Sequence, residues 1–174
     1  MKAGNIILLT RRKGKWYNPR VILSYLIALA STKDRNKIDT IATHSAIIYS
    51  DNNKLYVREM ENKGSVSIEL ERYLKENKGR IKIKGHESIF ATPEFNKKCK
   101  YEKVEYDFIS LFFFQLIKVI INKSIGKETL YKRKCSEDTS RMFNILFNIF
   151  ENVEHITPSN IDDLTKNWKI VWIG

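Results

Sequence analysis

The chain has 174 residues, of which 43% are hydrophobic, and its formal net charge is +11. This length and composition exclude an intrinsically disordered chain and predict a single domain over residues 1–174. The positive charge favours an anionic polymer or a membrane surface as a partner, without choosing between them, and no motif for specific nucleic-acid recognition accompanies it.

In chain order, the hydrophobic pattern predicts short strands that alternate with a few helices. Apolar residues recur at three- and four-residue spacing after Asn18 and Pro19, which predicts a helix to residue 30, and residues 31–39 are expected to form a loop. Residues 41–49 read as a strand with Ala42, His44, Ala46 and Ile48 on one face. The other strands are expected at 6–10, 54–60, 65–68, 80–84 and 168–173. Helices are expected at 69–76, 107–122, 135–151 and 160–164, and residues 90–99 as a loop or short helix.

This mixture of antiparallel strands and separate helices predicts an α+β fold. Secretion and membrane insertion are not indicated. The apolar run at 6–9 is too short for a signal peptide, and the run at 108–121 is short for a membrane span and is interrupted by Gln115 and Lys118. We therefore expect a cytoplasmic protein with reduced cysteines. The oligomeric state is not indicated.

Cys135 is the first candidate for chemistry. It follows the basic residues 132–134 and opens a predicted helix. Unpaired N–H groups at a helix start and neighbouring positive charges both favour a thiolate. The alternative for an isolated cysteine is a buried, inert side chain.

His44 lies in the middle of its predicted strand and is a candidate base, although such a histidine is more often simply packed. Glu59 lies on the next strand, and the turn near Asn52 and Asn53 would bring the two strands side by side. A carboxylate there could orient the imidazole, as the third member of a catalytic triad does. Glu61 is the alternative for this role. No spacing of histidine, cysteine or carboxylate residues indicates a metal site, and no cofactor is expected.

Several segments, taken in order, carry a resemblance to a known family. They are KAGNIIL at 2–8, THSAIIY at 43–49, YVREM at 56–60 with GSV at 64–66, YDF at 106–108 with CSE at 135–137, and TPSNI at 157–161. In this order the chain resembles the permuted NlpC-type papain-like hydrolases, the YiiX-like group, in which the histidine precedes the cysteine.

The resemblance implies a circularly permuted papain-like (NlpC-type) fold, with a small antiparallel sheet packed against helices. It implies that Cys135 is the nucleophile, His44 the base and Glu59 the third residue, with Tyr106 and Ser136 in the substrate pocket. The implied function is a cysteine hydrolase, an amidase or peptidase that works through an acyl-enzyme on a cell-wall-type peptide or related amide. The alternatives are a lipid acyl hydrolase or acyltransferase on the same scaffold, or a catalytically inactive basic binding module.

Overall fold

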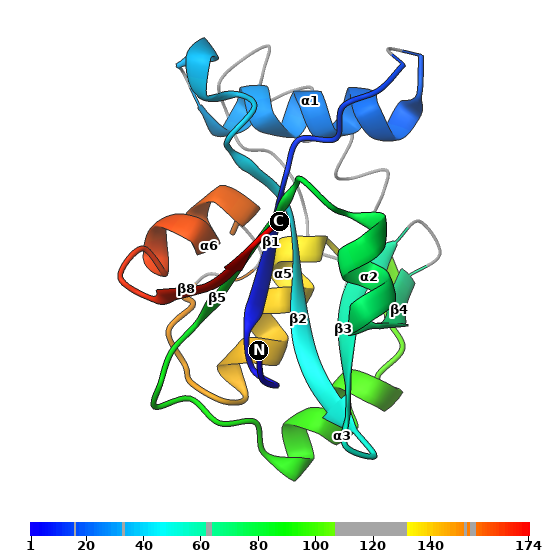
Figure 1. Ribbon diagram of the computed structural model, residues 1–174, viewed down its shortest axis with the longest axis vertical. Coiled ribbons are helices and arrows are strands. Elements are labelled where there is room, and N and C mark those ends of the chain that lie inside the picture. The colour runs from blue at the N-terminus through cyan, green and yellow to red at the C-terminus, as the bar shows by residue number, and fades with distance from the viewer. Residues whose placement is uncertain (16, 33, 62–63, 107–131, 152, 154–155) are drawn as a thin grey trace.

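The structure, a computed structural model, describes residues 1–15, 17–32, 34–61, 64–106, 132–151, 153 and 156–174. Its centre is a six-stranded antiparallel sheet in the order β4-β3-β2-β1-β5-β8 (Figure 1). The strands are β1 (Ile6–Thr10), β2 (Ala42–Asp51), β3 (Lys54–Glu61), β4 (Gly64–Glu69), β5 (Ile81–Gly85) and β8 (Lys169–Ile173).

Five α-helices pack against this sheet within the described part of the chain. They are α1 (Pro19–Ser31), α2 (Leu70–Glu76), α3 (Pro93–Tyr101), α5 (Cys135–Asn144) and α6 (Pro158–Leu164). The predicted α+β class and antiparallel sheet are therefore confirmed. The helix predicted at 107–122 lies outside the described residues.

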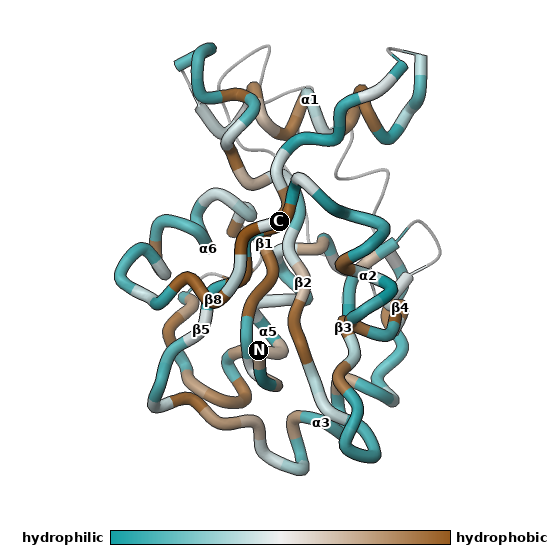
Figure 2. Tube along the Cα trace, in the orientation of Figure 1, coloured by the Kyte–Doolittle hydropathy of each residue, from teal (hydrophilic) through white to brown (hydrophobic). Residues whose placement is uncertain are grey.

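Alternation along the central strands divides the interior into two layers. Ile6 and Leu8 of β1 pack in one cluster with Phe95 of α3 and Phe143 of α5. Ile7 and Leu9 point the other way and pack in a second cluster with Leu70 and Tyr73 of α2. Figure 2 shows the hydrophobic course of β1 and β2 through the middle of the molecule, between these layers. The central strands β1 and β2 are thus mostly buried on both faces.

A bulge interrupts β2 beside His44. Leu9 of β1 pairs with His44, but the next residue, Thr10, pairs with Ala42, so Thr43 is an extra residue in β2. The expectation that Ala42 shares a face with Ala46 and Ile48 is therefore wrong. Ala42 packs in the cluster of α3 and α5, because the bulge reverses the alternation.

Helix α5 is shorter than predicted. It ends at Asn144, not at residue 151. The amide side chain of Asn144 donates to the carbonyl of Phe150 (2.8 Å) and accepts from its N–H (3.1 Å), which holds the following chain in a turn. Phe150 is still buried in the core, so its apolar character did not reveal that the helix had ended.

The remaining differences concern short elements. Residues 90–99 were expected as a loop or short helix, and the helix begins at Pro93 with the hydroxyl of Thr92 capping the N–H of Phe95. A 3-10 turn, Arg35–Lys37, occupies part of the expected loop at 31–39. A two-stranded parallel pair, β6 (Glu105–Tyr106) and β7 (Lys132–Arg133), was not predicted.

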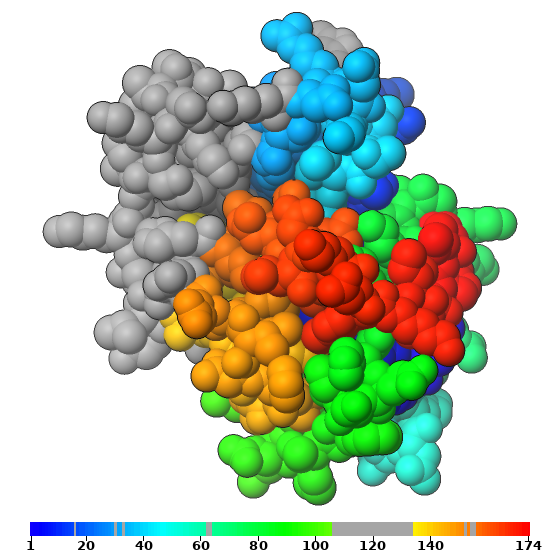
Figure 3. Space-filling view, turned by 90° about the vertical axis from the view of Figure 1, so that its left-hand side faces the viewer, coloured from blue at the N-terminus to red at the C-terminus, as the bar shows by residue number. Residues whose placement is uncertain are grey.

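The C-terminal elements α6 and β8 form much of the described surface on the side shown in Figure 3. Lys84 of β5 holds α6 on the sheet edge, because its buried ammonium group donates to the carbonyl of Asp162 (2.7 Å) and binds its carboxylate. No helix among the described residues is long and apolar enough to cross a membrane.

Candidate active site

His44 and Glu59 form the first half of the site. Nε2 of His44 lies 2.7 Å from Oε2 of Glu59, and the hydroxyl of Tyr73 donates to the same carboxylate oxygen at 2.9 Å. Continuing the β2–β3 register from its Ile47–Arg58 pair would place Glu61, not Glu59, directly opposite His44. Glu59 is the diagonal neighbour, and the contact with Tyr73 fixes its carboxylate toward the imidazole.

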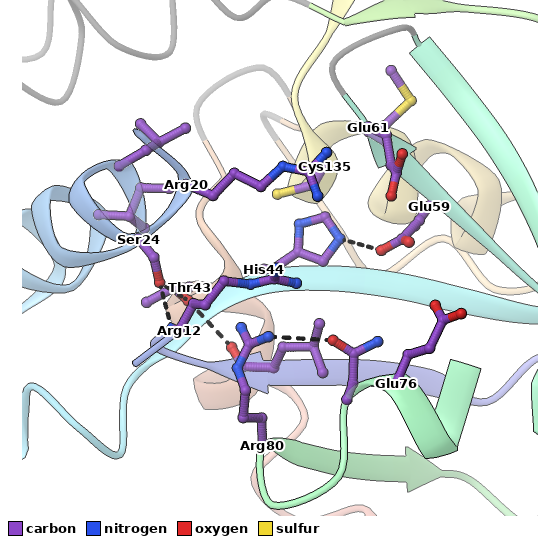
Figure 4. Close-up of a pocket in the computed structure, with 15 residues that line it drawn as sticks. Arg12, Arg20, Ser24, Thr43, His44, Glu59, Glu61, Glu76, Arg80 and Cys135 are labelled. Atoms are coloured by element: carbon purple, nitrogen blue, oxygen red, sulfur yellow. Dashed lines mark hydrogen bonds and ion pairs between the residues drawn. The ribbon is translucent and has the colours of Figure 1, made fainter. Parts of the chain in front are cut away.

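Cys135 supplies the other half. It is the first residue of α5, as the sequence predicts, and only 3% of its surface is exposed. Figure 4 shows its sulfur beside the edge of the His44 ring that faces away from Glu59. The charge and hydrogen-bonding capacity of His44, with the backbone N–H groups of Ser45 and Ser136, act together to lower the pKa of the Cys135 thiol.

These contacts polarise the thiol and the imidazole as a pair. Burial opposes the charged form of each group, but their mutual attraction outweighs it. The Cys135 thiolate and the Glu59 carboxylate raise the pKa of His44 to about 10. Burial alone would raise the pKa of Cys135, yet the imidazolium and the two backbone N–H groups lower it. The pair thus favours a thiolate next to an imidazolium, and 22% of the His44 side chain stays exposed to an incoming ligand.

Glu59 keeps the imidazole charged. Its burial would raise the pKa of the carboxyl, but His44 and Tyr73 lower it, so Glu59 is an anion at neutral pH. The buried phenol of Tyr73 has its pKa raised well above the ordinary value, first by burial and then by Glu59, and therefore remains a hydrogen-bond donor. The chain Tyr73, Glu59, His44, Cys135 is fully connected.

A buried ion pair fixes α5 relative to β3. Nε of Arg58 donates to Oδ2 of Asp138 at 2.8 Å, and Nη2 donates to Oδ1 at 3.0 Å. Nη1 of Arg58 donates to the carbonyls of Cys99 (2.9 Å) and Glu102 (2.7 Å). Arg58 precedes Glu59 and Asp138 lies one helical turn after Cys135, so this pair sets the spacing between the strand that bears Glu59 and the helix that bears Cys135.

A cavity of about 290 Å³ opens beside these residues, between α1, the ends of β2 and β3, and the end of α2 (Figure 4). Cys135, His44 and Glu59 belong to its wall. Its lining is mostly polar, with apolar contributions from Leu9, Leu23, Ile27 and Met60. A substrate in this space would reach the sulfur directly.

The other residues expected at the site are placed differently. Glu61 lines the cavity but is exposed and makes no hydrogen bond with His44. Ser136 is buried, and its hydroxyl donates to the carbonyl of Ile156 at 2.7 Å, so its backbone N–H serves the site and its side chain serves the fold. The backbone of Tyr106 lies in β6, and its side chain lies outside the described part of the chain.

Sequence reasoning missed the supporting residues. Tyr73 belongs to the apolar face of a predicted helix, and no local pattern distinguishes it from a core residue. Arg58 and Asp138 lie 80 residues apart. The one available signal was a charged residue within an otherwise apolar segment, since Arg58 lies among the buried residues Val57 and Met60 of one strand.

Neither the models of protein families nor the curated proteins match the chain. Within the described residues, no group of three or more histidine, cysteine or carboxylate side chains is arranged to hold a metal ion.

Proposed function

We propose that this protein is a cysteine hydrolase, an amidase or peptidase in which Cys135 is the nucleophile, His44 the general acid and base, and Glu59 the residue that orients His44. The observation that carries the proposal is the position of His44, which is hydrogen-bonded to Glu59 on one side, lies beside the Cys135 sulfur on the other (Figure 4), and lines a cavity. A buried inert cysteine would need neither a lowered pKa nor a basic partner.

In the first half of the reaction, the Cys135 thiolate attacks the carbonyl carbon of an amide. A carbon–sulfur bond forms and the carbonyl oxygen becomes an oxyanion. The N–H of Cys135 stabilises that oxyanion, because the first amide of a helix has no acceptor within the helix. The imidazolium of His44 then gives its proton to the leaving nitrogen, the carbon–nitrogen bond breaks, and a thioester remains on Cys135.

In the second half, neutral His44 takes a proton from water as the water attacks the thioester. The carbon–sulfur bond breaks, the carboxylic acid leaves, and the thiolate–imidazolium pair is restored. Glu59 accepts a hydrogen bond from Nε2–H throughout, which leaves the other ring nitrogen free to exchange protons at the sulfur.

The arrangement also supports the finer fold assignment that the resemblance implies. We propose a circularly permuted papain-like architecture, in which a sheet strand carries the histidine before the chain reaches the cysteine. His44 lies on β2 and Cys135 heads α5, in that order, with Glu59 on the intervening strand β3. A cell-wall-type peptide or related amide is the substrate class that this resemblance implies.

Alkylation by iodoacetamide, followed over pH and mapped by mass spectrometry, tests the proposal. We expect Cys135 to react with an apparent pKa well below about 8.5, the ordinary value of a thiol. Cys99 is an internal control, because burial raises its pKa to about 12. His44→Ala should return the Cys135 profile to that of an ordinary thiol, and panels of amides and muropeptides would then identify the scissile bond.

An ordinary thiol profile at Cys135 that ignores His44→Ala would contradict the proposal and would favour the inactive basic binding module. In that case Cys135→Ala should also leave the biological activity of the protein unchanged. Binding to anionic ligands would become the function to measure.

A second candidate uses the same acyl-enzyme chemistry on a lipid ester. It is favoured by α1, which lines the cavity with Leu23 and Ile27 and also exposes Ile22 (40%) and Tyr25 (42%). Such a surface, with a net charge of +11, suits an anionic membrane. A lipid hydrolase should sediment with anionic vesicles and release fatty acid from them, whereas a peptidase should cleave muropeptides and ignore vesicles.

A further inference from the structure

Two arginines from different elements reach into the cavity beside Cys135. Arg12 follows β1, and Arg20 lies in the first turn of α1. Figure 4 shows both side chains extending from the α1 side of the cavity toward His44 and Cys135. Within the described part of the chain, neither guanidinium group makes a hydrogen bond or an ion pair. Two free guanidinium groups at a reactive thiol need an explanation, because arginines in such sites usually hold an anion.

The other charges of the cavity have partners. Arg80 donates twice to the carbonyl of Thr10, at 2.8 and 3.2 Å. Glu76 is bound by Arg72 at 2.7 Å. Glu59 is bound by His44 and Tyr73.

Glu61 is the one lining carboxylate that makes no ion pair among the described residues. Two free arginines therefore face one free carboxylate, and the cavity has an uncompensated positive charge. Burial lowers the pKa of Arg80, and the like charge of Arg12 lowers it further, although Glu59 acts in the opposite direction.

We propose that Arg12 and Arg20 bind a carboxylate of the substrate, placed next to the carbonyl that Cys135 attacks. This inference rests on the proposed function. It narrows the substrate to an amide that carries a carboxylate close to the scissile bond, as an acidic or C-terminal residue of a peptide does. The planar guanidinium groups can each pair with both oxygens of a carboxylate.

The size and lining of the cavity favour a carboxylate over a phospholipid headgroup. Charge alone does not separate them, because the phosphodiester of a phospholipid carries a single negative charge, as a carboxylate does. A cavity of about 290 Å³ with a mostly polar lining accepts a group the size of an amino acid, whereas an acyl chain needs a long apolar groove. The experiment therefore has to distinguish binding of a carboxylate from binding of a lipid phosphate.

The test compares two alkylating probes that differ only in charge, iodoacetate and iodoacetamide. In both, the Cys135 thiolate attacks the methylene carbon, the carbon–sulfur bond forms, and iodide leaves. We express the ratio of the two rates relative to the same ratio for N-acetylcysteine. On this scale we expect the wild-type protein to react faster with iodoacetate than with iodoacetamide. In the double variant Arg12→Gln with Arg20→Gln, the relative ratio of the two rates should be roughly tenfold lower, because two charge-assisted contacts to the carboxylate are removed.

Arg35→Gln is the matched control. It removes one guanidinium charge, where the double variant removes two, from the exposed 3-10 turn outside the lining of the cavity, and should leave the ratio unchanged. The wild-type preference should also decrease as sodium chloride is added, which requires no variant to fold. A ratio that does not respond to the double variant, or one that falls equally in Arg35→Gln, would overturn the inference.

Protection experiments distinguish the source of the anion. At constant ionic strength, acetate should slow alkylation of Cys135 by iodoacetamide more than inorganic phosphate or vesicles of phosphatidylglycerol do. Protection by phosphate or vesicles without protection by acetate would overturn the carboxylate assignment. An ordinary iodoacetamide profile at Cys135 contradicts the proposed function itself, whereas an activated Cys135 without an arginine-dependent preference contradicts only this inference.

Discussion

Arg58 and Asp138 form a bidentate ion pair in the interior, and each of the two side chains is only 2% exposed. The pair joins β3 to α5 next to Glu59 and one turn after Cys135. The same guanidinium group also satisfies two backbone carbonyls at the end of α3. Geometry of this quality offsets the cost of removing both charges from water, and it fixes how far the nucleophile lies from the residue that orients its base.

Arg58→Met should therefore destabilise the protein strongly. It removes both contacts of the Arg58 guanidinium group with the buried Asp138 carboxylate, and we expect the free energy of unfolding to fall by about 3–5 kcal/mol. Urea denaturation followed by circular dichroism measures this change. Arg72→Met is the matched control, because Arg72 pairs with Glu76 on the surface, and it should leave the free energy of unfolding nearly unchanged.

A double variant separates the loss of the pair from the loss of packing. Arg58→Met with Asp138→Leu removes both charges, so it should be more stable than Arg58→Met alone. Equal stability of the two variants would mean that the buried carboxylate is not the source of the loss.

The coupling between Cys135 and His44 predicts a reciprocal effect on their pKa values. The Cys135 thiolate is the largest contribution that raises the pKa of His44 to about 10. In Cys135→Ser that contribution is absent, and we expect the pKa of His44 to fall. Titration of the His44 imidazole resonances by NMR, in the wild-type protein and the variant, measures the change. An unchanged His44 value in Cys135→Ser would show that no ion pair exists.

The same pair sets the pH range of activity. The reactive form needs Cys135 deprotonated and His44 protonated, and it exists above the lowered pKa of Cys135 and below the raised pKa of His44. Once a substrate is known, kcat/KM should rise as pH passes the lowered pKa of the thiol and fall as pH approaches about 10. A fall near pH 6.5 instead would indicate a neutral imidazole with an ordinary pKa.

The sequence predicted well those features that local patterns encode. Alternation placed β2 and β3, the turn at Asn52 and Asn53 joined them, and the basic stretch before Cys135 coincides with the start of α5. These features are decided by neighbouring residues. The bulge at Thr43, by contrast, depends on pairing with β1, which lies more than 30 residues earlier in the chain.

Contacts between distant residues had no local signature. The end of α5 depends on the side chain of Asn144 bonding with Phe150, although the apolar spacing continues beyond it. Arg12 and Arg20 look like ordinary members of a basic segment, and only the packing of α1 beside β2 brings them to Cys135. Local sequence patterns thus predicted the strands and helices, whereas the residues that line the cavity could be identified only from the tertiary structure.

The sequence left Glu59 and Glu61 as alternatives for orienting His44, and their geometry now predicts different results for the two. Glu59→Gln removes the charge bonded to Nε2, so it should lower the pKa of His44 and reduce the rate of acyl transfer by about 10- to 1,000-fold. Glu61→Gln is the matched control, since Glu61 lines the same cavity without contacting His44, and it should leave the pKa of His44 nearly unchanged.

Both variants keep the size and shape of the side chain, and NMR titration of His44 with iodoacetamide kinetics at Cys135 can be compared directly between them. Tyr73→Phe provides an intermediate case, because it removes one donor to Glu59 but leaves the carboxylate charged. The effects on His44 should decrease in the order Glu59→Gln, Tyr73→Phe, Glu61→Gln. If Glu61→Gln had the largest effect, the bond between Glu59 and His44 could not be the one that orients the base, and the third position of the site would have to be reassigned.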